Sequence, residues 1–130
     1  MFGRAAGVRC AEVLDSNERQ PELPMDAVDL ALSRLDRFRN ANGGTPTAAL
    51  RLRMQKAMQS NCAVFRDGPV LKEGVEKINA IWKDAEDIKV SDRSLIWNSD
   101  LVETMEFDTL IALAAVTVVA AENRKESRGA

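Results

Sequence analysis

Apolar residues recur every three or four positions over most of this chain, which is the spacing of one face of an α-helix. One such stripe consists of Met25, Val28, Leu32, Leu35 and Phe38. A second, near-heptad stripe consists of Leu71, Val75, Ile78, Trp82 and Ala85, widened by Ile81 and Ile88. No stretch alternates between apolar and polar for more than about four residues, as a half-buried strand would. The pattern therefore predicts helices and no extended sheet.

Prolines and glycines divide this helical pattern into segments. The sequence "NANGGTP" ends one stripe, and its Gly43 and Gly44 permit positive φ. Thr45 and Pro46 read as an N-cap and the first residue of the next helix. "FRDGP" places another proline just inside a new helix, and Ser99 or Asn98 is a further candidate N-cap. We expect helices at about 2–14, 26–39, 46–61, 69–89 and 99–125.

These elements predict an all-α fold. Three long helices, at about 46–61, 69–89 and 99–125, would form a three-helix bundle, with the additional helix at 26–39 against one end. The polar connector "DSNERQPELP" contains two prolines and is the clearest boundary in the chain. We therefore separate residues 1–20, an N-terminal helix at 2–14 plus linker, from a helical bundle at 21–130.

Both ends of the chain read as interrupted helices. The N-terminal helix has no capping residue ahead of Phe2. Near the C-terminus the uncharged run "LIALAAVTVVAA" is followed by "ENRKESRGA", in which five of nine residues are charged. The uncharged run is too short to cross a bilayer, which takes about 20 residues, and we expect a buried helix core. The pattern predicts a piece of a longer chain.

The amino-acid composition excludes most classes of catalytic site. The chain has 130 residues, a net charge of −2, no histidine and two cysteines, Cys10 and Cys62. Histidine-dependent triads are therefore impossible, and the charge balance does not favour nucleic acid as a partner. The cysteines match no metal spacing, so we expect buried, structural, free thiols. Neither "FGRAAG" nor "NGG" follows a strand or precedes the residues of a phosphate loop. We predict no catalytic, cofactor-binding or metal-binding residue.

Three further features have plain structural interpretations. Trp82 lies on an apolar stripe and is expected in the core rather than on a ligand platform. Trp97 stands in a connector beside Ile96, and it either covers the bundle or meets a partner. The cations Arg124, Lys125 and Arg128 suit the negative end of a helix dipole. Residues alone thus indicate a soluble helical bundle and no function.

Several longer stretches of the sequence resemble a known protein family. "FGRAAG", "AVFRDGPVLKEGVEKI", "WNSDLVETMEFDTL" and "ENRKESRGA" resemble, in order and spacing, the flavoprotein subunit of succinate dehydrogenase. The likeness is to the alphaproteobacterial and mitochondrial type and extends from Phe2 to Ala130. It implies that residues 1–20 hold the last helix of an FAD-binding domain. Residues 21–130 would be most of the C-terminal helical domain, truncated at its C-terminus.

The resemblance also implies a function for the parent subunit. Such a subunit oxidises succinate to fumarate with FAD, in the tricarboxylic acid cycle, and passes electrons to an iron–sulfur subunit and quinone. It is a peripheral subunit, on the cytoplasmic face of the bacterial inner membrane or the mitochondrial matrix side. The piece itself would insert in no membrane, bind no FAD and be inactive. Residues 2–14, deprived of the FAD domain, would self-associate or be poorly protected.

Other interpretations remain open at this point. The alternative parents are a fumarate reductase, since a piece without the active site does not reveal the direction of catalysis, and an L-aspartate oxidase. The chain would alternatively be a free-standing helical module that binds a protein partner through the Trp97 region and the Arg124–Arg128 end.

Overall fold

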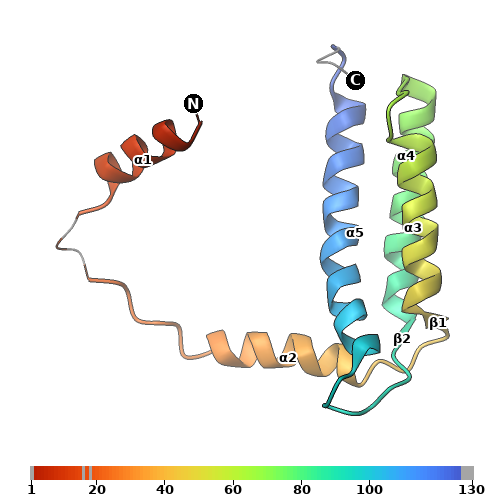
Figure 1. The fold of residues 1–130 in the computed structure, drawn as a ribbon, viewed down its shortest axis with the longest axis horizontal. Helices are drawn as coiled ribbons and strands as arrows, with labels where there is room; N and C mark the ends of the chain where they lie inside the picture. The colour runs from red at the N-terminus through yellow and green to blue at the C-terminus, as the bar shows by residue number, and fades with distance from the viewer. Residues whose placement is uncertain (1, 16, 18, 127–130) are drawn as a thin grey trace. The chain divides into compact units, whose positions relative to one another are not determined.

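The computed structural model of the protein describes residues 2–15, 17 and 19–126 (Figure 1). It divides the chain into two units, residues 1–30 and 31–130. The elements in order are α1 (Phe2–Val13), α2 (Ala27–Arg39), β1 (Thr45–Pro46), α3 (Thr47–Asn61), α4 (Gly68–Asp84), the 3-10 helix η1 (Ala85–Asp87), β2 (Ile88–Lys89) and α5 (Ser99–Asn123). The all-α prediction is confirmed, because the two described strands have only two residues each.

Helices α3, α4 and α5 lie side by side and form the predicted three-helix bundle (Figure 1). Each helix buries one face, and the three faces meet in a single core. The buried side chains are Leu50, Met54 and Ala57 of α3, Leu71, Ile78 and Ile81 of α4, and Leu101, Phe107, Ile111, Ala114, Val118 and Ala121 of α5. Removing this apolar surface from water is the main force that holds the bundle together.

Helix α4 ends earlier than the predicted boundary at residue 89. It stops at Asp84, and after η1 the chain extends through Ile88 and Lys89, which pair in parallel with Thr45 and Pro46. Ile88 and Val90 are buried there, so this segment belongs to the core without being helical. The sequence misleads because Ile88 continues the helical spacing although it lies in an extended segment paired with Thr45 of β1.

The start of α3 also differs from the prediction. Pro46, not Thr45, is the N-cap residue, with extended φ and ψ of −62° and 141° and no capping hydrogen bond from its side chain. Thr45 instead belongs to β1. By contrast Asn98 is confirmed as the N-cap of α5, because its side chain accepts a hydrogen bond from the amide of Leu101 at 2.8 Å.

Gly43 is required for space, not for the positive φ that the sequence suggested; neither Gly43 nor Gly44 adopts the left-handed conformation. A β-carbon on Gly43 would lie 2.1 Å from the carbonyl oxygen of Asp87. The two segments are held this close by the Gly43 amide, which donates to the carbonyl of Ile88 at 3.0 Å, and by the Gly44 amide, which donates to the Asp87 carboxylate at 3.0 Å.

Only the C-terminal part of the α2 stripe is buried. Phe38 belongs to the core and Leu35 is partly buried against it, so this part of α2 packs on one end of the bundle as predicted. Met25, Val28 and Leu32, on the same predicted stripe, are exposed. The apolar stripe is therefore longer than the surface that the bundle offers it.

The N-terminal unit buries none of its described side chains. Every residue of α1 is exposed, including Phe2, Val8 and Val13. Cys10 is exposed as well, which corrects the expectation of a buried thiol, whereas Cys62 is buried and free as expected. Cys10 lies on α1, which has no buried face in this chain.

The uncharged run in α5 is buried core, as the sequence predicted, on one side only. Ile111, Ala114 and Val118 are buried, but Leu113 and Val116 on the other side of the helix are 58% and 68% exposed. By length and composition alone, α5 is the one helix in the described part of the chain that is long and apolar enough to cross a membrane.

A buried asparagine joins α3 to α4. Asn61 is 2% exposed, and its amide donates to the carbonyl of Val70 at 3.0 Å and to the Glu73 carboxylate at 2.9 Å. Its oxygen accepts from the Lys77 ammonium at 3.1 Å, and Lys77 also pairs with Glu73 at 3.0 Å. Hydrogen bonds from Lys77 and Asn61, with the charge of Lys77, lower the pKa of Glu73 below 4.5.

This lowered pKa predicts a pH-dependent contribution to stability. A carboxylate with a depressed pKa in the folded state stabilises the fold above its unfolded value of 4.5 and loses that contribution as the pH falls through the folded value. We expect Glu73→Gln to melt at a lower temperature than wild type at pH 6, with the gap closing below pH 4.5. Circular dichroism melts across this range test it, with exposed Glu76→Gln as the control; a gap that is constant with pH would contradict the assignment.

Candidate functional site

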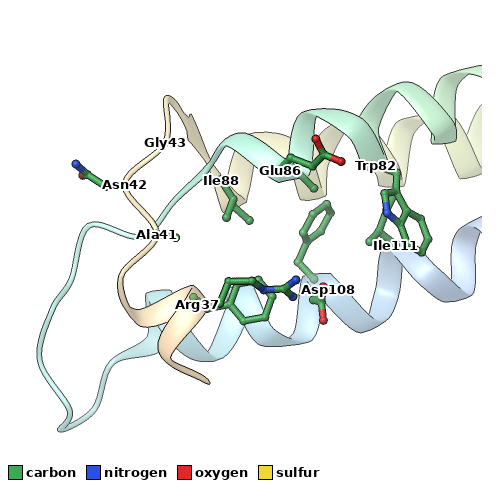
Figure 2. Close-up of a pocket in the computed structure, with 12 residues that line it drawn as sticks. Arg37, Ala41, Asn42, Gly43, Trp82, Glu86, Ile88, Asp108 and Ile111 are labelled. Atoms are coloured by element: carbon green, nitrogen blue, oxygen red, sulfur yellow. Dashed lines mark hydrogen bonds and ion pairs between the residues drawn. The ribbon is translucent and has the colours of Figure 1, made fainter. Parts of the chain in front are cut away.

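One cavity of about 250 Å³ lies where the C-terminal end of α4 faces α5 and the segment after α2 (Figure 2). Its lining residues are Arg37, Phe38, Ala41, Asn42, Gly43, Trp82, Ala85, Glu86, Ile88, Phe107, Asp108 and Ile111. Trp82 borders this cavity and is 44% exposed, so the prediction that it belongs to the core is wrong. The neighbouring Ile81 fills the core position instead, at 4% exposure.

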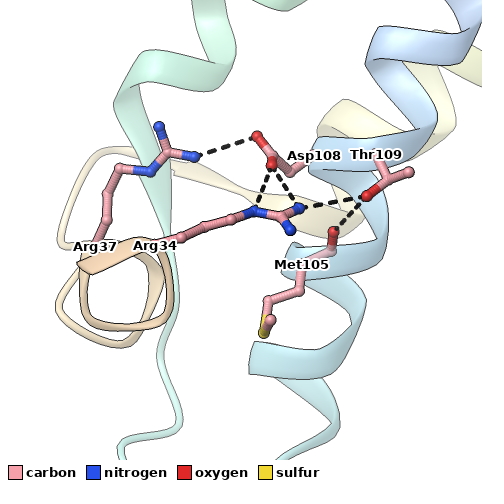
Figure 3. A network of polar contacts seen from close by, with 5 residues as sticks. All are labelled: Arg34, Arg37, Met105, Asp108 and Thr109. Carbon is pink, nitrogen blue, oxygen red and sulfur yellow. Dashed lines mark hydrogen bonds and ion pairs between the residues drawn. The ribbon is translucent and has the colours of Figure 1, made fainter. Parts of the chain in front are cut away.

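Two charged residues of this cavity, Arg37 and Asp108, pair with each other, and Asp108 also pairs with Arg34 (Figure 3). The Arg34 guanidinium donates to one oxygen of Asp108 at 2.8 and 3.2 Å and to the Thr109 hydroxyl at 3.3 Å. Arg37 donates to the other Asp108 oxygen at 3.3 Å, and its guanidinium lies 4.4 Å from the centre of the Phe38 ring. The network fastens α2 to α5, and the sequence did not indicate it because the partners are about 70 residues apart.

This arrangement supports packing more readily than catalysis. The cavity walls are largely apolar, and the Asp108 carboxylate already accepts bonds from two arginines. Within residues 2–15, 17 and 19–126, no three histidine, cysteine, aspartate or glutamate side chains gather as metal ligands would. The cavity has room for a small apolar group, and its residues Arg37 and Asp108 link α2 to α5.

The connector between β2 and α5 is held in one conformation by side-chain hydrogen bonds. Asn98 donates to the carbonyls of Asp92 and Ser94 at 2.9 and 2.8 Å. The Asp100 carboxylate accepts from the amides of Ser91 and Asp92 at 2.6 and 3.3 Å. Backbone and hydroxyl hydrogen bonds from Ser94 lower the pKa of Asp92. The polar residues of this connector thus serve to fix its shape.

That fixed connector presents Trp97 to solvent. Leu95, Ile96 and Trp97 are 66%, 77% and 96% exposed, so Trp97 does not cover the bundle. Its φ of 54° is the one left-handed value among the described non-glycine residues, a conformation that is strained for a bulky side chain. A cavity of about 510 Å³ lies beside it, lined by Leu35, Leu95, Trp97, Asn98, Ser99, Leu101 and Val102.

We expect Trp97→Gly to stabilise the chain by about 0.5–1 kcal/mol, because glycine adopts positive φ without steric cost and the exposed indole contributes little packing. The change corresponds to a few degrees in melting temperature. Trp97→Ala keeps the β-carbon and is the matched control, expected to melt like wild type. If both variants melted at lower temperature, the indole would be packed and this interpretation would be wrong.

The structure describes two of the three C-terminal cations, Arg124 and Lys125. Arg124 is the C-cap residue of α5. The Lys125 ammonium donates to the carbonyl of Glu122 at 2.7 Å and contacts its carboxylate at 3.1 Å. Lys125 therefore hydrogen-bonds a carbonyl group in the last turn of α5 and places a positive charge at the helix C-terminus, as the sequence suggested. Arg128 lies outside the described residues.

Neither the β1–α3 junction nor the N-terminus of α4 fits the pyrophosphate of a flavin dinucleotide. Such a cofactor needs a strand, a glycine-rich turn and a helix N-terminus open to its pyrophosphate. Here β1 leads directly into α3, with no glycine-rich turn between them. The N-terminus of α4 is already capped by the Asp67 carboxylate, which accepts from the amide of Val70 at 2.9 Å and leaves a negative charge there. We assign no flavin contact and no chemical step to these residues.

Comparisons with known proteins agree with this helical fold. Residues 51–130 match the family described as fumarate reductase flavoprotein C-term. The chain is 49% identical over 130 residues to the mitochondrial succinate dehydrogenase [ubiquinone] flavoprotein subunit of Oryza sativa subsp. japonica, covering all of this chain and 21% of that protein. It is 47% identical over the same length to the succinate dehydrogenase flavoprotein subunit of Rickettsia bellii, covering 22% of it.

A solved structure shows the same fold. An Escherichia coli quinol fumarate reductase chain superposes with a TM-score of 0.81 at 28% identity, over 98% of this chain and 22% of that one. The chain thus spans about a fifth of the length of the relatives it matches. These matches show that the chain belongs to the succinate dehydrogenase and fumarate reductase flavoprotein family, to whose C-terminal helical region it corresponds.

Proposed function

We propose that this chain forms the C-terminal helical part of a succinate dehydrogenase flavoprotein subunit. The observation that carries this proposal is the identity of 49% and 47% to two such subunits, against 28% to a fumarate reductase chain. The whole subunit would oxidise succinate to fumarate. The contrast in identity favours succinate dehydrogenase over the fumarate reductase alternative.

Within that subunit the helical part would act as a scaffold. Its charged side chains are engaged in ties such as Arg34–Asp108 and Asn61–Glu73, and its core is apolar. FAD would be held by the rest of the subunit, with residues 1–20 as the end of that domain and residues 21–130 as the helical domain. Electrons would pass to an iron–sulfur subunit, with the assembly peripheral to the bacterial inner membrane or on the matrix side of the mitochondrial one.

A hybrid subunit tests this proposal. This chain would replace the aligned stretch of the Rickettsia bellii subunit, and the product would be purified and assayed for bound flavin and for succinate oxidation with an artificial electron acceptor. We expect flavin and activity close to those of the unmodified subunit. The chain on its own is expected to bind no FAD, since the described residues offer no pyrophosphate site.

Two controls make the result interpretable. A hybrid that carries Ile78→Asp in this chain should lose flavin and activity, because the scaffold would not fold. A hybrid built from the aligned stretch of the fumarate reductase should retain less of both, because its core is less closely related. If the hybrid with this chain were soluble and folded yet held no flavin, the proposal would be wrong.

Self-association through residues 2–14 stays a prediction. The exposed apolar residues of α1 are consistent with it, because an isolated helix of this length is marginal in water unless it packs on something. Light scattering of the chain with and without residues 1–20 measures it. Hydrogen exchange that shows strong protection of α1 in a monomer would contradict both self-association and fraying.

A further inference from the structure

Helix α5 differs from its neighbours because it is apolar on two opposite sides. Its buried side, with Phe107, Ile111, Ala114 and Val118, packs on α3 and α4. The opposite side carries Val102, Leu113 and Val116, which are 55%, 58% and 68% exposed. A helix that is apolar all round is normally covered all round. The bundle covers only half of α5.

The exposed apolar residues of α5 lie along one line of its surface, which Glu106, paired with Arg51 at 3.3 Å, interrupts once near its N-terminal end. Val102, Glu106, Thr109, Leu113, Val116 and Ala120 follow one another at intervals of four and three, so they lie along one line of the helix surface. From Thr109 onward this line has no charged residue. At its N-terminal end it meets the cavity beside Trp97, which Val102 also lines. We call the exposed side chains of Val102, Thr109, Leu113, Val116 and Ala120 the outer strip.

The outward faces of the other two bundle helices are charged instead. Arg53 and Lys56 are exposed on α3, and Lys72, Glu76 and Lys83 are exposed on α4. Such charged faces are well solvated and do not require another surface to pack on them. Among the described helices of the bundle, the part of the outer strip from Thr109 to Ala120 is the one outward face without a charged residue.

We propose that the outer strip of α5 is the surface on which the flavin-binding part of the same subunit packs. This inference rests on the proposed function. In the relatives, the matched stretch is 21–22% of the chain, so a large folded remainder belongs to the same polypeptide. An uncharged helix face next to a rigid Leu95–Trp97 connector suits a permanent, apolar contact between two parts of one subunit.

A lipid bilayer is a poorer occupant of this surface. The uncharged stretch from Thr109 to Ala121 is about 20 Å long at 1.5 Å per residue, against about 30 Å of hydrocarbon. The first turns of α5 carry Asp100, Glu103 and Glu106, and its inner side is already packed in the bundle. One face of a helix that is held in a water-exposed bundle does not span a membrane.

A matched pair of substitutions tests the proposal. Leu113→Glu places a charge in the outer strip, and Leu52→Glu places one at a similarly exposed leucine on α3, where the exposures are 58% and 51%. In the chain alone, both variants should melt like wild type, because both side chains face solvent. In the hybrid subunit, Leu113→Glu should reduce bound flavin and succinate oxidation at least about ten-fold, whereas Leu52→Glu should change neither.

The outcomes separate this inference from the proposed function. If the unmodified hybrid holds no flavin, the proposed function fails. If the unmodified hybrid works and Leu113→Glu works equally well, the outer strip is not the packing surface. The inference is also overturned if Leu113→Glu abolishes a dimer of the chain alone in sedimentation, or abolishes its cosedimentation with phosphatidylglycerol vesicles, because the occupant would then be a second copy or a membrane.

Discussion

Ile78→Asp is expected to unfold the bundle. Ile78 is 1% exposed in the centre of the α4 face that packs on α3 and α5. An aspartate there would bury a carboxylate with no partner, at a cost of several kcal/mol. That cost is a large share of the 5–15 kcal/mol by which a domain is usually stable. Circular dichroism and urea titration should show little or no cooperative transition.

Two comparisons separate the charge from the lost apolar volume. Ile78→Val removes one methylene and should cost only about 0.5–1.5 kcal/mol. Lys72→Asp places the same carboxylate on the exposed side of α4 and should leave the transition almost unchanged. A cooperative melt of Ile78→Asp at the wild-type temperature would show that this face of α4 is not in the core.

Gly43→Ala is expected to be the second most damaging change. The added methyl group would meet the Asp87 carbonyl oxygen at 2.1 Å, a distance that no side-chain motion relieves, because both atoms belong to or are fixed on backbone. The segment after α2 must then move away from β2 and lose the Gly43–Ile88 and Gly44–Asp87 hydrogen bonds. We expect a loss of about 3 kcal/mol, seen as a lower midpoint in urea.

Gly68→Ala provides the matched control. Gly68 begins α4, and a β-carbon there meets no other atom within 4 Å. Alanine has the higher helix propensity, so this variant should be as stable as wild type or slightly more stable. If Gly43→Ala and Gly68→Ala behaved alike, the close approach of residue 43 to Asp87 would not exist in solution.

The sequence by itself determined where the helices lie and which side of most of them is buried. Regular spacing identified Ile78 and Leu71 as core, and local capping chemistry placed the start of α5 at Asn98 or Ser99, of which Asn98 is the cap. These features depend on residues within a few positions of one another. The same holds for the absence of histidine chemistry, since composition alone excludes it.

Tertiary structure decided how far each helix continues and what lies beyond its apolar side. Ile88 keeps the helical spacing but is buried in an extended segment beside β1, and Trp82 keeps the spacing of a core stripe but opens onto a cavity. Leu113 is as apolar as Ile111 but is 58% exposed. The spacing of apolar residues along the chain indicates which helix face they share. Only the packing of distant segments determines whether another surface covers that face.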